Sequence, residues 1–139
     1  MADISVTVAS VVADSGYKYR DEIAGATITA GQPCYLDSTD SYKAKTADAN
    51  ASAATAAVKG IALHAALAGQ PVRLITSGYL TVSASGVLTV GTWYVCGSGA
   101  GGIAPSADLT SGEYSSRLGV ATTTNKLRVD LLATGAVTA

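Results

Sequence analysis

Three short blocks of sequence recur, in the same order, in the second half of this 139-residue chain. The matching pairs are Ile28–Leu36 with Leu88–Cys96, Lys59–Ala62 with Leu118–Ala121, and Arg73–Gly78 with Asp130–Gly135. The distance between partners falls from 60 to 59 to 57 residues along the chain, as small deletions between the blocks would produce. An internal repeat sets the architecture ahead of any local pattern. Because two copies are too few for a solenoid, we expect two similar β-rich halves that cover each other's apolar faces.

Short strand-like runs separated by glycine and proline turns predict an all-β fold. We expect strands at residues 4–8, 33–37, 59–66, 72–75, 79–82, 92–96, 119–121 and 126–132. The Ala-rich residues 44–58, with Asp48 as an N-cap, fit either a short helix or a loose loop, and residues 108–117 fit a helical turn. The expected fold is mainly β with at most short helical turns. Two small antiparallel modules would form one barrel-like or sandwich-like domain.

The repeat divides the chain into three parts. Residues 1–20 lie outside it and are expected to form an N-terminal arm. Residues 21–78 make the first β module and residues 79–139 the second, and the two are expected to pack as one globular unit.

The arm holds the candidate residues for contact with a capsid or with a neighbouring subunit. Ile4, Val6 and Val8 alternate with polar residues, a pattern suited to adding a strand to an exposed sheet edge. The alternative is that residues 4–8 complete the protein's own sheet. Tyr17, Tyr19 and Arg20 belong to the densest polar and aromatic cluster of the chain, and Tyr and Arg are favoured anchors of protein interfaces.

Composition argues against several classes of partner. Charged residues make up 14% of the chain, against about 25% in average globular proteins, and the net charge is −1. No basic face is available for the phosphate contacts that dominate nucleic-acid binding. No apolar run reaches the length of about 18 residues that a membrane-spanning helix needs. A surface with so few charges is tolerable where partners cover much of it.

The sequence shows no catalytic, cofactor-binding or metal-binding signature. His64 is the only histidine, and no His, Cys, Asp or Glu cluster has the spacing of metal ligands. Residues 97–102 match G-x-G-x-x-G, but Pro105 follows closely and no acidic residue stands about 20 positions on, so a glycine hairpin is the better interpretation. We therefore expect no enzyme activity, no cofactor and no metal.

Three further residues have expected places in the core. Cys34 and Cys96 lie in strand-like runs, and buried free thiols are favoured over a bond between them. Trp93, the only tryptophan, is expected to be largely buried between strands.

Five segments carry a resemblance to a known family. They are Gly31–Asp37, Val58–Ala62, Ala68–Gly78, Gly101–Asp108 and Arg117–Ala121. Together they resemble tailed-phage capsid decoration, or cement, proteins, and the likeness covers roughly residues 25–135. It rests on structural glycines and strand patterns, and residues 1–20 do not visibly share it.

The resemblance implies a small β-rich structural protein on the outside of an assembled phage head. Its partners would be the major capsid protein and itself, often as a trimer at local threefold sites, after synthesis in the host cytoplasm. Some head-fibre and tail-associated proteins share similar β modules, so a receptor-binding module is the alternative function. A small hydrolase using an Asp and His64 is a third, weaker interpretation of the same residues.

Overall fold

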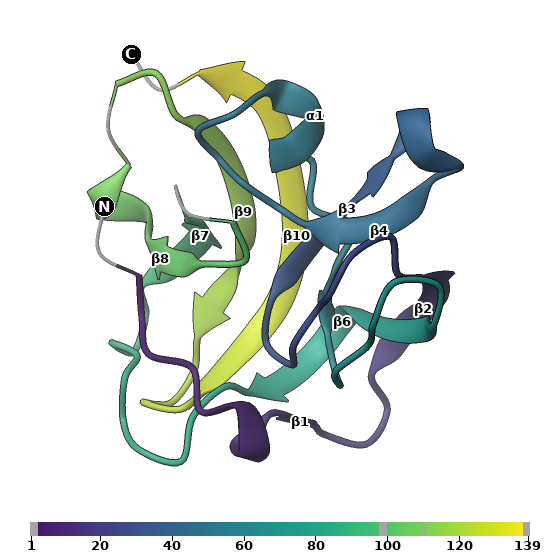
Figure 1. Ribbon diagram of the computed structural model, residues 1–139. Coiled ribbons are helices and arrows are strands. Elements are labelled where there is room, and N and C mark those ends of the chain that lie inside the picture. The colour runs from purple at the N-terminus through teal and green to yellow at the C-terminus, as the bar shows by residue number, and fades with distance from the viewer. Residues whose placement is uncertain (1–2, 98–99, 110, 138–139) are drawn as a thin grey trace.

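The strands of the chain pair into one curled antiparallel sheet that forms a half-barrel (Figure 1). This is a computed structural model, and it describes residues 3–97, 100–109 and 111–137. The expected all-β fold is confirmed, since helix is confined to one short α-helix and three 3-10 turns in the described residues.

The elements follow the chain in order. The strands are β1 (Val12–Ala13), β2 (Lys18–Ile23), β3 (Pro33–Asp37), β4 (Lys43–Thr46), β5 (Gly60–Ala62), β6 (Pro71–Thr81), β7 (Trp93–Cys96), β8 (Ile103–Pro105), β9 (Tyr114–Ala121) and β10 (Lys126–Val137). The helical elements are η1 (Val8–Ser10), η2 (Ser38–Asp40), α1 (Ala53–Ala56) and η3 (Ser106–Asp108).

The two halves of the sheet repeat the same order of strands. In the first half, hydrogen-bonded neighbours run β2, β6, β5, β3, β4. In the second half they run β6, β10, β9, β7, β8. Strand β6 therefore serves both halves: its first part lies within the first module, and its second part opens the next one.

The first two sequence blocks fall on equivalent strands in equivalent register. Cys34 of β3 is paired with Gly60 of β5, and Tyr94 of β7 is paired with Gly119 of β9. The turns before these strands also match. Gly31 donates its N–H to the carbonyl of Ala62, and Gly91 donates to the carbonyl of Ala121, each at 2.8 Å. Both turn glycines have a positive φ, of 86° and 83°, which explains why glycine recurs at this position.

The third block is displaced by four residues from the pairing that the structure shows. Ala62 is paired with Leu74, and its counterpart Ala121 is paired with Leu127, so Leu74 corresponds to Leu127 rather than to Leu131. The connection before β6 spans residues 63–70, whereas the one before β10 spans only residues 122–125. A strand looks similar to itself after any even shift, because side chains alternate with a period of two. The third block was therefore aligned in the wrong register by the sequence comparison.

Strands expected at residues 72–75 and 79–82 are one continuous strand, β6, so the division at residues 78 and 79 falls inside it. The repeat also extends further back than residue 21. Tyr19 lies opposite Ile75, and Tyr79 lies opposite Arg128, the residue that corresponds to Ile75. Strand β2 is thus the first-module counterpart of the second part of β6.

The helical expectations are only partly correct. Residues 43–46 form β4, and the single α-helical turn begins later, where Ser52 and Thr55 form a reciprocal capping box. Asp48 is therefore not the N-cap; it accepts a hydrogen bond from the Asn50 N–H at 2.8 Å instead. The helical turn expected at residues 108–117 is wrong, because η3 ends at Asp108 and β9 begins at Tyr114.

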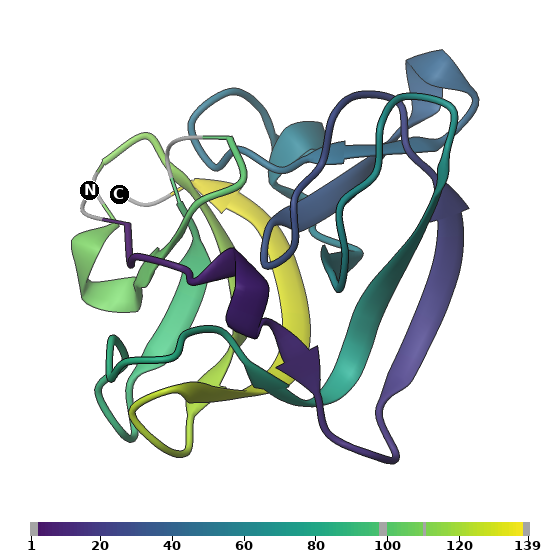
Figure 2. The same cartoon turned by 60° about the horizontal axis from the view of Figure 1, so that its bottom comes forward.

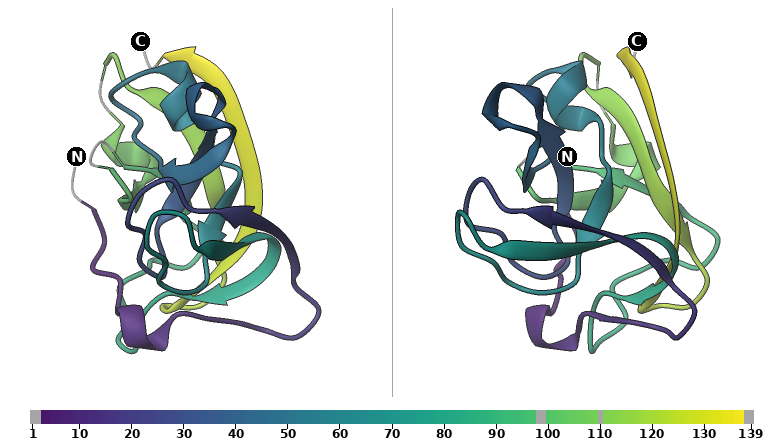
Figure 3. Two further views of the ribbon diagram at one scale, coloured as in Figure 1. Left: turned by 45° about the vertical axis from the view of Figure 1, so that its right-hand side comes forward. Right: turned by 90° about the vertical axis from the view of Figure 1, so that its right-hand side faces the viewer.

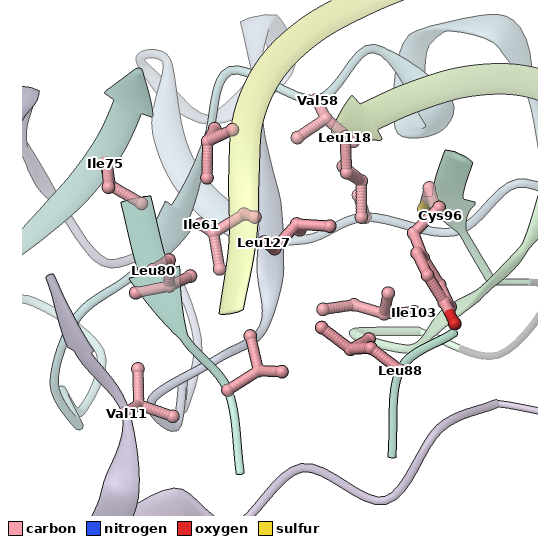
Figure 4. Close-up of a cluster of buried hydrophobic side chains, with 14 of the residues drawn as sticks. Val11, Val58, Ile61, Ile75, Leu80, Leu88, Cys96, Ile103, Leu118 and Leu127 are labelled. Atoms are coloured by element: carbon pink, nitrogen blue, oxygen red, sulfur yellow. The ribbon is translucent and has the colours of Figure 1, made fainter. Parts of the chain in front are cut away.

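The main core is built by both modules together (Figure 4). Its side chains include Ile61 and Ile75 from the first module and Leu80, Leu118 and Leu127 from the second, all fully buried. A smaller core lies within the first module and contains Cys34, Val72 and Leu74 among its members. The modules thus cover each other's apolar faces, as the repeat suggested.

The aromatic side chain of the core is Tyr94, not Trp93. Tyr94 is 1% exposed, and its hydroxyl accepts the Thr89 N–H at 2.8 Å. Trp93, its neighbour on β7, is only half-buried because adjacent residues of a strand point to opposite faces. The Arg117 guanidinium lies 4.5 Å from the centre of the Trp93 ring on that outer face. The cysteines are as expected, since Cys34 and Cys96 are buried free thiols.

The arm runs across the molecule rather than away from it (Figure 2). Ile4 donates its N–H to Ile103 of β8 at 2.7 Å, and Thr7 donates to Val82, just past β6, at 3.0 Å. The Thr7 hydroxyl also lies 3.0 Å from the hydroxyl of Ser83, which is fully buried. Because these bonds go to two different segments, residues 4–8 do not form the expected strand, and η1 begins at Val8.

Candidate partner-binding surface

Strand β2 brings the polar and aromatic cluster of the sequence onto the surface of the sheet. Residues on alternate positions of a strand share a face. Tyr19, Asp21 and Ile23 therefore lie on one face of β2, while Arg20 and Glu22 lie on the other. Tyr19 is 48% exposed and Ile23 is 44% exposed, so this strand carries two of the large apolar side chains that remain open to solvent.

Arg73 of β6 organises the first of these faces. It lies directly opposite Asp21 in the ladder, and its guanidinium donates to both carboxylate oxygens, at 2.8 Å and 3.2 Å. The hydrogen bonds from Arg73 lower the pKa of the Asp21 carboxyl, and the same contact raises the pKa of Arg73. Both side chains are well exposed, so the fixed geometry matters more here than any gain in stability.

The tyrosines extend this arrangement. The Arg73 guanidinium sits 3.8 Å from the centre of the Tyr19 ring, a cation–π contact. The Tyr17 ring lies 5.5 Å from the Tyr19 ring at an angle of 45°. An open hollow of about 580 Å³ is lined by residues of this cluster and by Leu63 and His64. Tyrosine held in place by arginine is the kind of rigid anchor found in protein interfaces.

Both ring nitrogens of His64 form hydrogen bonds with backbone groups. Its Nε2 accepts the Arg73 N–H at 3.1 Å, so Nδ1 carries the proton and donates to the carbonyl of Ala65 at 2.9 Å. The ring therefore caps a strand end in this arrangement. Asp21, the nearby carboxylate, is bound to Arg73 rather than to the imidazole. The geometry thus favours a structural role for His64.

The opposite face of β2 carries an ion pair, with the Arg20 Nε 3.0 Å from the Glu22 Oε1. From Lys18 to Glu22 the strand is paired with β6 alone. At its end the other edge is closed by β4, where Ala24 forms a parallel bridge with Ala44 and the Gly25 N–H donates to the Ala44 carbonyl at 2.8 Å. In Figure 2 β2 forms the right-hand margin of the molecule, and Figure 3 shows it beside β6 from two further sides.

The six contact residues expected from the sequence do not form one surface. Tyr17, Tyr19 and Arg20 belong to the β2 region. Ile4 and Val6 are partly buried against the protein's own main core, and of the first three only Val8, at 51% exposed, points clearly to solvent. Sequence reasoning missed Arg73, because the residue lies 52 positions from its partner Asp21 and only the β2–β6 pairing brings them together.

Within the described residues, no group of three or more His, Cys, Asp or Glu side chains is placed to hold a metal ion. The G-x-G-x-x-G segment connects β7 to β8, and Gly97 donates to the carbonyl of Gly102 at 2.9 Å; residues 98 and 99 lie outside the described part. No helix in the described ranges is long and apolar enough to cross a membrane.

Comparison with models of known protein families finds no match, and comparison with curated proteins finds no similar sequence.

Proposed function

We propose that this protein is a structural component of a tailed-phage virion that binds the outer surface of the assembled head and reinforces it. Its partners would be the major capsid protein and further copies of itself, arranged as a homotrimer. The resemblance noted in the sequence supports the class. In the structure the resembling residues are module-building ones: Gly31 makes a turn with positive φ, and Gly60 lies against β6.

The observation that carries the proposal is a pair of exposed valines on a fastened arm. Val8 is 51% exposed and Val12 is 59% exposed, and both lie on the segment that the repeat does not include. Backbone hydrogen bonds hold the arm on both sides of the valines. Ile4 and Thr7 make them before Val8, and after Val12 the Asp14 N–H donates to the Tyr79 carbonyl at 2.9 Å. The valines are thus presented at fixed positions rather than on a loose tail.

The binding free energy expected from the two valines fits attachment by several copies at once. Covering the exposed half of one valine contributes about 1 kcal/mol, so one subunit gains little from this pair. Three arms of a trimer that bind together raise the effective concentration of each contact and make the attachment tight.

The test is co-sedimentation of the purified protein with empty heads of its phage. We expect the wild type to bind and the Val8→Ser, Val12→Ser variant to lose most of its binding while it keeps its thermal stability. Val90→Ser is the matched control, because Val90 is 59% exposed, as Val12 is, but lies in the connection before β7. Failure of the wild type to bind heads would overturn the proposal. Affinity for host-surface glycans instead would favour a receptor-binding module.

A further inference from the structure

The connection between β3 and β4 holds two successive residues in a backbone conformation that favours glycine. Ser41 has a φ of 55° and Tyr42 a φ of 58°, and in the described ranges these are the two non-glycine residues with a positive φ. This left-handed region is uncommon for any residue with a side chain, and for a bulky one it is an outlier. Glycine or asparagine adopts it readily. The chain therefore keeps a tyrosine where the backbone would be more relaxed without one.

Burial of the ring does not explain this choice. Tyr42 is 63% exposed, the largest exposed fraction among the large apolar side chains of the described residues. A ring packed in the core could offset a strained backbone through its contacts, but this ring lies mostly in solvent. A strained residue of this kind, observed in a structure, is a reason to look for a function.

Polar contacts hold the connection in its shape. The Tyr42 N–H donates to the Asp37 carbonyl at 2.8 Å, which closes the loop. The Asp37 carboxylate accepts the Thr39 N–H at 2.9 Å, and Lys45 donates to its other oxygen at 2.8 Å. Lys45 also lies 3.3 Å from a carboxylate oxygen of Asp40. A strained conformation persists only where the surrounding structure fixes it, and these contacts fix the backbone at Tyr42.

The repeat shows that a module does not require a tyrosine at this place. The equivalent connection of the second module, between β7 and β8, is the glycine-rich segment 97–102, where Gly97 donates its N–H to the Gly102 carbonyl at 2.9 Å. Residues that build both modules recur in both, as the turn glycines do. Tyr42 has no aromatic counterpart in the segment 97–102, so the fold of the module does not explain it.

We propose that Tyr42 is an anchor residue that inserts its ring into a pocket on the shell protein of the head. This contact rests on the proposed function, because it adds a second attachment point to the same partner. Tyrosine suits the task, since its ring gains free energy from burial while its hydroxyl needs one hydrogen-bond partner. The pocket that fits it has apolar walls and a carbonyl or carboxylate acceptor at its end. Because the backbone of Tyr42 is already fixed, binding loses little conformational entropy.

The two attachment points lie at opposite ends of the molecule. In Figure 1 the connection between β3 and β4 is at the upper right, and β1, which carries Val12, is at the bottom; both views of Figure 3 keep them at opposite ends. A subunit held by Tyr42 at one end and by Val8 and Val12 at the other lies along the shell rather than standing on it.

Co-sedimentation with empty heads of the phage tests the ring. Tyr42→Ala removes the ring, so it should lower the affinity for heads about tenfold or more, whereas Tyr42→Phe should keep most of it. Leu67→Ala is the matched control and should bind as the wild type does. Leu67 is 59% exposed and lies in the connection between β5 and β6, but its φ is not positive.

The same experiment separates this contact from the proposed function. If the wild type binds heads, Val8→Ser with Val12→Ser does not, and Tyr42→Ala binds as the wild type does, the anchor is wrong and the proposed function stands. A wild type that does not bind heads overturns both.

Tyr42→Gly separates the strained backbone from the contact. Glycine removes the left-handed penalty and loses only part of that gain to the greater freedom of the unfolded chain, so the variant should melt roughly 2 °C above the wild type. It should nonetheless bind heads as weakly as Tyr42→Ala, because the ring is gone. A Tyr42→Gly protein that melts below the wild type, or that binds heads normally, would overturn the inference.

Discussion

Replacing Gly119 by alanine tests why glycine recurs in the second sequence block. Gly60 and Gly119 occupy the same position in the two modules, each beside the last long strand of its module. A Cβ on Gly119 would overlap the carbonyl oxygen of Arg128 and would stand 2.9 Å from its carbonyl carbon. A Cβ on Gly60 would stand 2.5 Å from the Cβ of Leu74 and 3.0 Å from the carbonyl oxygen of Ile75. The adjacent strand therefore occupies the space of a side chain at both positions.

The expected cost follows from what obstructs the methyl group. Adding a carbon to a tightly packed site costs about 1–3 kcal/mol, and obstruction by backbone atoms places Gly119→Ala at the upper end, since backbone cannot rotate aside. In a chain of this size 1 kcal/mol lowers the melting temperature by roughly 4 °C, so we expect a loss of about 12 °C.

Gly91→Ala is the control that separates crowding from backbone conformation. Gly91 has a φ of +83°, and a Cβ added there would meet nothing within 4 Å, so only the left-handed conformation opposes alanine. That conformation costs a non-glycine residue about 1 kcal/mol, or roughly 4 °C. Thermal unfolding followed by circular dichroism measures both variants. A Gly119→Ala protein that loses no more stability than Gly91→Ala would refute the close-approach explanation.

Three further predictions use other parts of the structure. Burial raises the pKa of Cys34 and of Cys96 to about 12, so a thiol reagent at pH 8 should label neither in the native protein and both after unfolding in urea. The hydrogen bond from Lys45 lowers the pKa of Asp37 to about 2 from 3.8; the stability this contributes is present above about pH 4 and is lost as the pH falls toward 2. Asp37→Asn should therefore melt below the wild type at neutral pH, and the difference should vanish near pH 2. Arg117→Ala should cost about 0.5–1 kcal/mol and make the fluorescence of half-buried Trp93 easier to quench with acrylamide; unchanged quenching would argue against the cation–π contact.

The sequence alone was sufficient for the fold class and for the presence of a repeat, because both depend on local pattern. Alternating apolar residues and turn glycines mark strands and their ends wherever they occur. Gly31 and Gly91 keep the same turn in both modules, and Gly60 and Gly119 keep the same close approach. Such requirements act on single positions, so they leave a repeated signature that comparison of the two halves detects.

The register of the third block, and the part that β6 plays in both modules, could not be predicted from local pattern. The third block matched four residues away from its true counterpart because an alternating strand resembles itself after an even shift. The fusion of two expected strands into β6 depends on pairing with β2, β5 and β10, which come from three distant parts of the chain. Likewise, which aromatic residue of β7 enters the core follows from the face that the sheet turns inward, and Tyr94 rather than Trp93 lies on it.

The arm and strand β2 show most clearly which features residue types predict and which only the tertiary structure decides. Residue types alone suggested that Ile4, Val6 and Val8 form a strand and that Tyr17, Tyr19 and Arg20 anchor a contact. Only the folded chain decides that Ile4 and Thr7 bond to two separated segments, while β2 pairs with β6 along its length. The reason is physical: a strand pattern specifies a backbone that needs partners, but the partners are supplied by whichever edge the tertiary structure brings alongside.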